Sequence, residues 1–471
     1  MSDNVSKALA RFARRVQYES LSEKTVAEVK RRVIDTLGCL ISGYDADASI
    51  AARKLAERYE MSKGATIIGL GKKAAVDFAA FANGTAVRYL DYNDTYLSVE
   101  PLHPSDVIAP LLALAEERGV TTKRLIAAIA AAYEVGVIFC DEASLKANGW
   151  DHVNYITLAT VVGGANLLGL TEEVTEQALA LAIVPHAAMR QTRNGEISMW
   201  KGAAAANAAR NAVFALQLAE CGMKGPYEPF EGTMGMNYQM LNRKLNVDRV
   251  VRKLDSCISP QGITNTFVKN WAVEYMTQSA IEAALELRKE LTSLEEVEHI
   301  HIDTFQMAYD VLAKDEQKWA PKTRETADHS LPYIVMVALE DGKIDLDTFA
   351  PERLANQKTL ERMNSILTIE VSEEMNAGYP EGNPNRITIR LKDGRVLQKL
   401  VKYPSGHRAN PMTDEQIEAK FRRLTTGYLS EEQQAQALQE LWKLEQLTDY
   451  DRLFSHFTIR AGKWKSTKGE K

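Results

Sequence analysis

The sequence has 471 residues, of which 45% are hydrophobic and 25% charged, and its formal net charge is -6. A chain of this length is expected to form two or three domains rather than one small core. The composition is ordinary for a soluble globular protein, and without a surplus of basic residues we expect no nucleic acid as a partner.

The N-terminal segment and the cysteines indicate a cytoplasmic protein without a structural metal. Residues 1–15 are polar and mixed in charge, and they lack the apolar centre of a signal peptide. The most apolar stretch, residues 125–140, is interrupted by Tyr133 and Glu134 and is short for a bilayer, so it predicts a buried helix and no membrane span. The cysteines are scattered without a CxxC pair, which disfavours disulfides and zinc or iron–sulfur sites: Cys39, Cys140, Cys221 and Cys257.

Helical periodicity dominates the first half of the chain. Ser22 is suited to cap a helix whose apolar side chains recur at helical spacing between residues 26 and 40. Further helices are predicted at residues 74–90, from Thr121 or Thr122 onward, and at 154–168. The helix predicted at 202–218 is dense in alanine, and because small side chains let helices approach closely, we expect it in the middle of a bundle.

The pattern changes after about residue 265. Period-two alternation predicts strands at residues 297–302 and 367–371, and a β-hairpin turns around Asp393-Gly394 between strands at 386–391 and 396–401. Helices are expected between these strands, at 280–291 and 331–340. This region therefore predicts a separate α+β domain.

Helical periodicity returns at the end of the chain. Thr413 and Gln416 have the spacing of a capping box, and Leu438, Leu441 and Trp442 recur at helical spacing. The expected fold is mainly α, with a large all-helical domain (1–265 plus 408–462) interrupted by an α+β domain (266–407). Residues 463–471 are charged and expected to fray.

The densest polar cluster lies at residues 90–96 and 102–106, between two apolar helices. Burying a polar group without a partner costs about 1–3 kcal/mol, so these side chains need partners. One interpretation is helix capping, in which Ser105 or Asp106 caps the following helix and Asp94 closes the preceding one.

Capping does not explain all of this cluster. It leaves out His103, and it leaves out Asp91 and Thr95, which would lie one helical turn apart. Capping and a functional site therefore both remain open for this segment.

Two further clusters each precede a helix rich in small residues. His152 follows Asp151 at the start of one, where a lone histidine is more often a structural cap. Lys201 enters the alanine-rich helix, and its charge must either extend to solvent or meet an anion. Backbone N–H groups at that helix N-terminus would strengthen an anion site.

Five motifs in order along the chain resemble those of the MmgE/PrpD family, whose members include 2-methylcitrate dehydratases and cis-aconitate decarboxylases. They are DYNDT at 91–95, HPSD at 103–106, DH at 151–152, SMWKG at 198–202 and ADHSLPY at 327–333. The resemblance covers nearly the whole chain.

The resemblance implies a helical domain interrupted by a smaller α+β lid, a homodimer, an active site between the domains, and no metal or organic cofactor. Position by position, the residues that match the family's active site are Asp91, Thr95, His103, His152 and Lys201. Lys269 and the 274–278 stretch, with Tyr275 and Gln278, match a lid segment that faces the site. Trp271-Ala272 departs from the aromatic–proline pair that is common there.

The resemblance implies dehydration of 2-methylcitrate or a similar small polycarboxylate, with propionate breakdown as the expected pathway. Without a metal, the protein must itself supply a base, an acid and charge neutralisation. We expect His103 and His152 to form the acid–base pair, with their individual roles open. Lys201, Arg193 and Lys269 would bind the carboxylates of the substrate. Asp91 with Thr95 would orient a histidine or bind the substrate hydroxyl.

Other functions fit the same residues. Decarboxylation of cis-aconitate and epimerisation of an iminodisuccinate-type dicarboxylate also pass through a carbanion beside a carboxylate, and a non-catalytic binding protein of the same fold is a further alternative. His299, His301 and His329 are interpreted as structural, with a lid hinge as a second role for His329. Residues 69–72 lack the spacing of a phosphate-binding loop.

Overall fold

The computed structural model describes residues 3–195 and 197–459, so the predicted fraying of residues 463–471 lies outside it. The chain divides into two compact units: a helical unit, which runs to Thr266 and resumes at Thr413, and an α+β unit, Phe267–Met412. These boundaries differ from the expected 265/266 and 407/408 by one and five residues. The mainly α fold is confirmed.

Helices account for most of the helical unit. In chain order they are α1 (Asn4–Arg15), α2 (Glu23–Ser42), α3 (Asp47–Ala56), α4 (Val76–Arg88), α5 (Ile108–Arg118), α6 (Thr122–Glu142), α7 (Val153–Leu168), α8 (Glu172–Ile183), α9 (Trp200–Glu220), α10 (Met236–Gln239), α11 (Val247–Ser256), α19 (Asp414–Thr425), α20 (Glu431–Leu441) and α21 (Tyr450–Ser455). Among the described residues, none of the helices is both long and apolar enough to cross a membrane.

The caps predicted for two helices are present. Ser22 accepts a hydrogen bond from the backbone N–H of Thr25 at the start of α2. Thr413 and Gln416 form a reciprocal capping box at the start of α19. Each satisfies backbone donors that the first turn of a helix leaves without an intrahelical partner.

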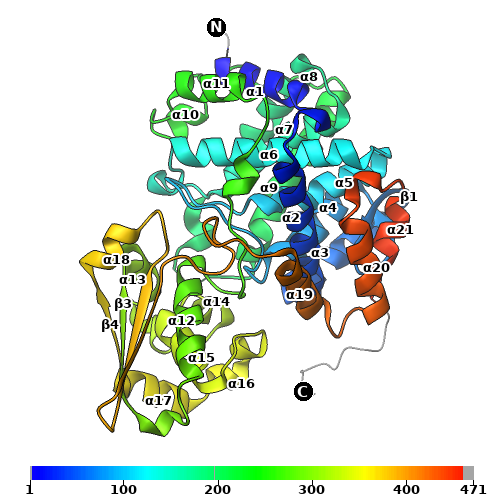
Figure 1. Ribbon diagram of the computed structural model, residues 1–471. Helices are drawn as coiled ribbons and strands as arrows, with labels where there is room; N and C mark the ends of the chain where they lie inside the picture. The colour runs from blue at the N-terminus through cyan, green and yellow to red at the C-terminus, as the bar shows by residue number, and fades with distance from the viewer. Residues whose placement is uncertain (1–2, 196, 460–471) are drawn as a thin grey trace. The chain divides into compact units, whose positions relative to one another are not determined.

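Small side chains let α9 pack closely, as its alanine content predicts. It packs against α4, α7 and α8, and α7 in turn packs against α6 (Figure 1). Ala203–Ala206 are all buried. A Cβ added at Gly84 of α4 would lie 3.0 Å from the Cβ of Ala206, so a side chain there would push the two helices slightly apart.

The helical unit is not entirely helical, because it contains an antiparallel hairpin that the sequence did not predict. Its strands are β1 (Glu60–Ile67) and β2 (Lys72–Ala74), and the turn between them contains Gly69 (φ 93°) and Gly71 (φ 75°). The first half of β1 is exposed and the second half buried, so it lacks the alternation that marks a half-buried strand. Residues 69–71 thus lie in a hairpin turn, and Lys72 begins β2.

A buried ion pair joins α19 to α2. Lys420 Nζ lies 2.6 Å from Asp35 Oδ1, both side chains are 1% exposed, and Lys420 also donates to the backbone oxygen of Tyr92. The pair links the two separate stretches of chain that form this unit.

Replacing Lys420 with methionine is expected to lower the free energy of unfolding by about 3–5 kcal/mol, because Asp35 would keep a buried charge without its partner. Urea denaturation measures the loss. The matched control is the double variant Asp35→Leu/Lys420→Met, which removes both charges and should recover most of the stability. A single variant within about 1 kcal/mol of the parent would contradict the expected penalty.

The α+β unit is built around a four-stranded sheet of order β4-β3-β5-β6, in which only β3 and β4 are parallel. Its elements are α12 (Gln278–Arg288), β3 (Val297–Thr304), α13 (Gln306–Leu312), α14 (Arg324–Ala327), α15 (Leu331–Asp341), α16 (Pro351–Leu354), α17 (Gln357–Ile366), β4 (Leu367–Val371), α18 (Glu373–Gly378), β5 (Asn385–Leu391) and β6 (Val396–Val401). The predicted Asp393-Gly394 hairpin joins β5 to β6.

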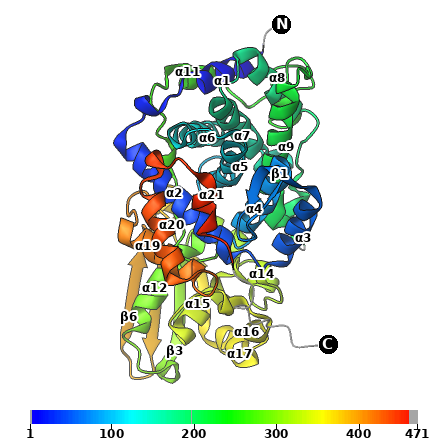
Figure 2. The ribbon, with the colours of Figure 1, turned by 90° about the vertical axis from the view of Figure 1, so that its right-hand side faces the viewer.

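One face of this sheet forms the core of the α+β unit. Helix α12 packs on β5 and β6, and α15 packs on α12 (Figure 2). Apolar side chains of β3 and β5, such as Ile300 and Ile389, lie in this core. His299 and His301 are half-buried and contact Thr368 of β4, which agrees with their interpretation as structural residues.

Candidate active site

The chain turns sharply after α4, and this turn sets the direction of Asp91. Helix α4 ends at Arg88, and Asp91 has a positive φ of 52°, a conformation that aspartate tolerates better than most residues. Asp91 and Thr95 are therefore not one helical turn apart, and that prediction was wrong. Thr95 instead donates to the backbone oxygen of Leu102, where an antiparallel bridge closes the loop.

Asp91 is the centre of a charge cluster. Its Oδ1 lies 2.9 Å from Arg88 Nη1 and 3.8 Å from His103 Nε2. Its Oδ2 lies 3.3 Å from the Nζ of Lys201, in the first turn of α9. The Lys201 side chain is 9% exposed, so it meets an anion inside the protein and does not extend to solvent.

His103 and His152 face the same small region. Their ring centroids are 5.8 Å apart and their planes are inclined by 58°. His103 precedes the short 3-10 helix η3 (Pro104–Val107), and its Nδ1 lies 2.8 Å from the backbone oxygen of Asp94. His152 precedes α7 but its side chain makes no capping hydrogen bond, so the structural-cap interpretation does not hold.

His152 is held in its neutral form. Burial lowers its pKa well below the usual 6.5, and the charge of Arg193 lowers it further, against the opposing effect of Asp151. Neither ring nitrogen has a hydrogen-bond partner among the described residues, although Nδ1 lies 3.4 Å from Asp151 Oδ1. An imidazole that is uncharged at neutral pH can accept a proton.

The pKa of His152 can be tested without a substrate. In an NMR titration its imidazole signals are expected to shift only well below pH 6.5, because burial disfavours the charged form. Arg193→Gln should move that pKa upward, toward 6.5, since a positive charge is lost. Arg190→Gln is the control, because Arg190 makes a smaller contribution of the same sign. Titration of parental His152 at or above pH 6.5 would contradict the assignment.

Arg193, in the 3-10 helix η5 (Arg190–Arg193), is already paired on one edge. Its Nε lies 3.1 and 3.0 Å from the two oxygens of Asp151. Burial lowers the pKa of Arg193, and Asp151 opposes that shift. Its Nη2 is buried and has no hydrogen-bond partner in the described chain, so one edge of the guanidinium remains available to an anion.

The side chains proposed as helix caps serve another purpose. No side chain caps α5, so the capping interpretation of Ser105 and Asp106 was wrong. Asn93 donates to both Ser105 Oγ and Asp106 Oδ1, at 3.0 and 2.9 Å. Burial raises the pKa of Asp106 to about 7, although Arg88 opposes the shift.

Arg88 and Asn93 were not among the predicted site residues. The i,i+3 spacing of Arg88 and Asp91 was the signal that could have identified Arg88.

The predicted residues of the α+β unit are buried within it. Lys269, Tyr275 and Gln278 are each at most 2% exposed. The Gln278 amide accepts from the backbone N–H groups of Asn270 and Trp271 and donates to the oxygen of Trp271, so it holds this loop. Burial raises the pKa of Tyr275 well above 10, and its ring stacks on Phe267. The role of these residues in substrate binding stays a prediction.

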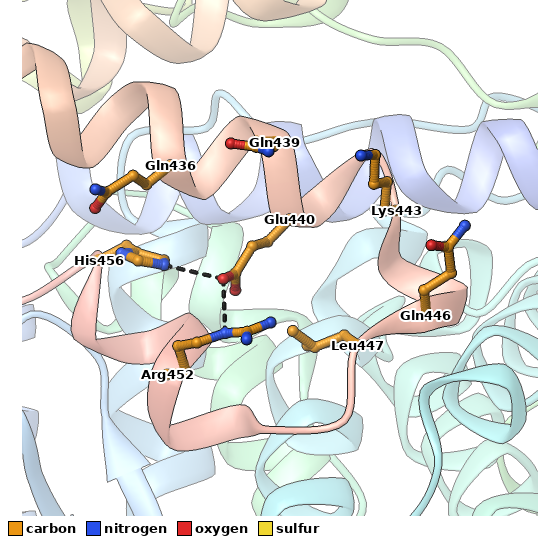
Figure 3. A pocket seen from close by; sticks show the side chains of 8 residues that line it. All are labelled: Gln436, Gln439, Glu440, Lys443, Gln446, Leu447, Arg452 and His456. Carbon is orange, nitrogen blue, oxygen red and sulfur yellow. Dashed lines mark ion pairs between the residues drawn. The ribbon is translucent and has the colours of Figure 1, made fainter.

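A hollow of about 440 Å³ lies among α20, α21 and the loop between them (Figure 3). Glu440 pairs there with Arg452 at 2.8 Å and His456 at 3.3 Å. Glutamines make up much of the remaining lining. Arg452 and His456 are thus already paired with a carboxylate, and Lys443 adds a further basic side chain to the lining.

Comparison with known proteins identifies the family of this chain. The family model of the MmgE/PrpD N-terminal domain matches residues 7–247, and that of the MmgE/PrpD C-terminal domain matches residues 271–446. The chain belongs to the MmgE/PrpD family. The resemblance that the five motifs indicated is thereby confirmed.

Relatives within the MmgE/PrpD family are named as dehydratases. A 2-methylcitrate dehydratase of Cupriavidus necator is 28% identical over 421 residues, which cover 83% of this chain and 84% of the relative. A mitochondrial 2-methylcitrate dehydratase of Yarrowia lipolytica is 26% identical over 408 residues, covering 80% and 75%. An alkylcitrate dehydratase of Talaromyces stipitatus is 28% identical over 370 residues, covering 72% and 73%.

Proposed function

We propose that this MmgE/PrpD protein is a dehydratase that acts on 2-methylcitrate or a similar small polycarboxylate. One observation carries the proposal: two histidines, whose ring centroids are 5.8 Å apart, occur together with the cations that surround Asp91. Removing a proton beside a carboxylate creates additional negative charge, which a buried cation can stabilise. The names of the relatives support dehydration as the reaction.

His152 is the base in this proposal. Its low pKa keeps it neutral, and neither ring nitrogen is committed to a hydrogen bond within the described protein. It removes a proton from the carbon next to a carboxylate, and the electron pair of the broken C–H bond forms the new double bond. Lys201 and Arg193 bind the carboxylates and stabilise the charge that develops.

His103 is the acid. Its Nε2 lies 3.8 Å from the Asp91 carboxylate, which is placed to interact with a proton on that nitrogen. The proton passes to the substrate hydroxyl as the C–O bond breaks, and the hydroxyl leaves as water. His152 then holds the proton taken from carbon and His103 has lost one, so exchange with solvent restores both.

Decarboxylation and epimerisation remain the alternatives, since both use a proton transfer at a carbon beside a carboxylate. Decarboxylation of cis-aconitate breaks a C–C bond and then requires an acid but no base to start the reaction. The dehydration proposal is favoured because it gives a role to a neutral His152 and because the relatives carry dehydratase names.

The decisive experiment follows products by NMR after chelator-treated enzyme is incubated separately with 2-methylcitrate, citrate, cis-aconitate and iminodisuccinate. Formation of 2-methylaconitate from 2-methylcitrate is the expected result, and its persistence after chelation would establish metal independence. Itaconate formed from cis-aconitate would replace dehydration with decarboxylation, and stereochemical inversion of iminodisuccinate would replace it with epimerisation. Inactivity with all four would overturn the substrate assignment. The homodimer, the cytoplasmic location and the link to propionate breakdown stay predictions.

A further inference from the structure

Asp94 lies directly behind His103 and makes two different kinds of contact. Its backbone oxygen lies 2.8 Å from His103 Nδ1. Its side chain, fully buried, is bound by other elements of the helical unit. The backbone contact determines which nitrogen of His103 carries the proton. The side-chain contacts hold the backbone of Asp94 in position.

The backbone contact determines which ring nitrogen carries the proton. A carbonyl oxygen can only accept a hydrogen bond, so His103 Nδ1 must be the donor. Neutral His103 therefore has its proton on Nδ1 and its lone pair on Nε2. Nε2 is the nitrogen that faces Asp91.

The Asp94 side chain fixes both ends of this hydrogen bond. Its Oδ1 accepts from the backbone N–H of Ser105, two residues after His103, at 2.8 Å. Its Oδ2 accepts from the hydroxyl of Tyr133 on α6 at 2.8 Å and lies 3.5 Å from Arg32 Nε on α2. The donor side of the loop and the acceptor carbonyl are thus anchored by one carboxylate.

The Tyr133 contact persists across the pH range in which the enzyme would work. Burial raises the pKa of Tyr133 well above 10, and the charge of Asp94 raises it further, so the hydroxyl keeps its proton. Tyr133 is one of the two residues that interrupt the apolar stretch at 125–140, and no other role in the site accounts for its hydroxyl.

We propose that Asp94, anchored by Tyr133, is a positioning residue that keeps His103 protonated on Nδ1 and leaves Nε2 as the nitrogen that exchanges protons with substrate. The role of Nε2 in proton exchange rests on the proposed function, in which His103 is the acid. The protonation of Nδ1 is a property of the unliganded protein and can be tested without any substrate.

The test uses protein labelled with ¹⁵N in its histidine rings, with the His103 signals identified by their loss in His103→Gln. Neutral His103 in the parent is expected to show a protonated Nδ1 and an unprotonated Nε2. Tyr133→Phe removes one anchor at little change in volume, and it is expected to introduce the other tautomer. Because Asp94→Asn removes a buried charge and could fail to fold, Tyr133→Phe is the primary variant.

Tyr155→Phe is the matched control, since Tyr155 is also a fully buried tyrosine but donates to the backbone oxygen of Ala143. It should leave the His103 tautomer unchanged. With substrate, Tyr133→Phe is expected to lower kcat by about tenfold, with KM within about twofold of the parent, whereas Tyr155→Phe should change neither.

Two results would overturn the proposal. One is an unprotonated Nδ1 in neutral His103 of the parent. The other is a Tyr133→Phe variant whose tautomer and kcat both match those of Tyr155→Phe. A correct tautomer in a protein that acts on none of the tested substrates would instead count against the proposed function and leave the positioning by Asp94 standing.

Discussion

Replacing His152 with glutamine is expected to lower kcat by about 10²–10⁴-fold, the range typical for loss of a general base. Glutamine approximates the size of histidine and can form hydrogen bonds, but it cannot accept the proton at neutral pH. The variant should keep its fold, because His152 does not cap α7 and its ring nitrogens have no hydrogen-bond partners among the described residues. Steady-state kinetics and circular dichroism measure the two effects.

A proton-exchange measurement isolates the step assigned to His152. In deuterated water the parent should exchange the substrate C–H proton, and His152→Gln should lose this exchange in parallel with turnover. His186→Gln is the control, since His186 is half-buried in the loop after α8 and outside the described site. Near-parental turnover in His152→Gln would remove His152 from the mechanism.

The second large effect is expected at Lys201. Lys201→Met should lower kcat/KM by about 10²–10³-fold, the cost typical of losing one group that stabilises charge in a transition state. The ammonium lies 3.3 Å from Asp91, so its loss also leaves that carboxylate with fewer positive neighbours near His103. Lys201→Arg should recover only part of the activity, because a planar guanidinium does not reproduce an ammonium at this position.

A matched lysine separates this effect from lost stability. Lys30 of α2 is also largely buried and pairs with Glu445 at 2.6 Å, outside the described site. Lys30→Met should therefore change stability while leaving kcat/KM within about twofold of the parent. Equal losses of activity in Lys30→Met and Lys201→Met would show that Lys201 acts only through the fold.

Local patterns predicted the elements that depend on near neighbours. Ser22, Thr413 and the Asp393-Gly394 turn have signatures within four residues, and the structure contains all three features. The hairpin at 60–74 was missed because burial changes halfway along β1, and this change depends on packing against other elements. The hydrophobic period of a sequence does not show where along a strand burial begins.

In the candidate site, too, the sequence indicated the residues marked by motifs but not the long-range contacts that support them. Asp91, His103, His152 and Lys201 were found because motifs marked them, and the structure brings them together. Their supporting contacts are long-range: Tyr133 binds Asp94 across 39 positions and Arg193 binds Asp151 across 42. Such contacts leave no local spacing in one sequence. The predicted side-by-side placement of Asp91 and Thr95 failed because α4 ends at Arg88 and Asp91 itself has a positive φ.

The join between α2 and α19 has a consequence for synthesis on the ribosome. Asp35 emerges early, but its partner Lys420 follows only after the whole α+β unit has been translated. At about 5–20 residues per second this delay is on the order of tens of seconds. Until then the surface of α2 that α19 covers is exposed in the nascent chain, so the N-terminal helices complete their fold after translation of the insert. Slow translation would therefore prolong the exposure of this surface of α2.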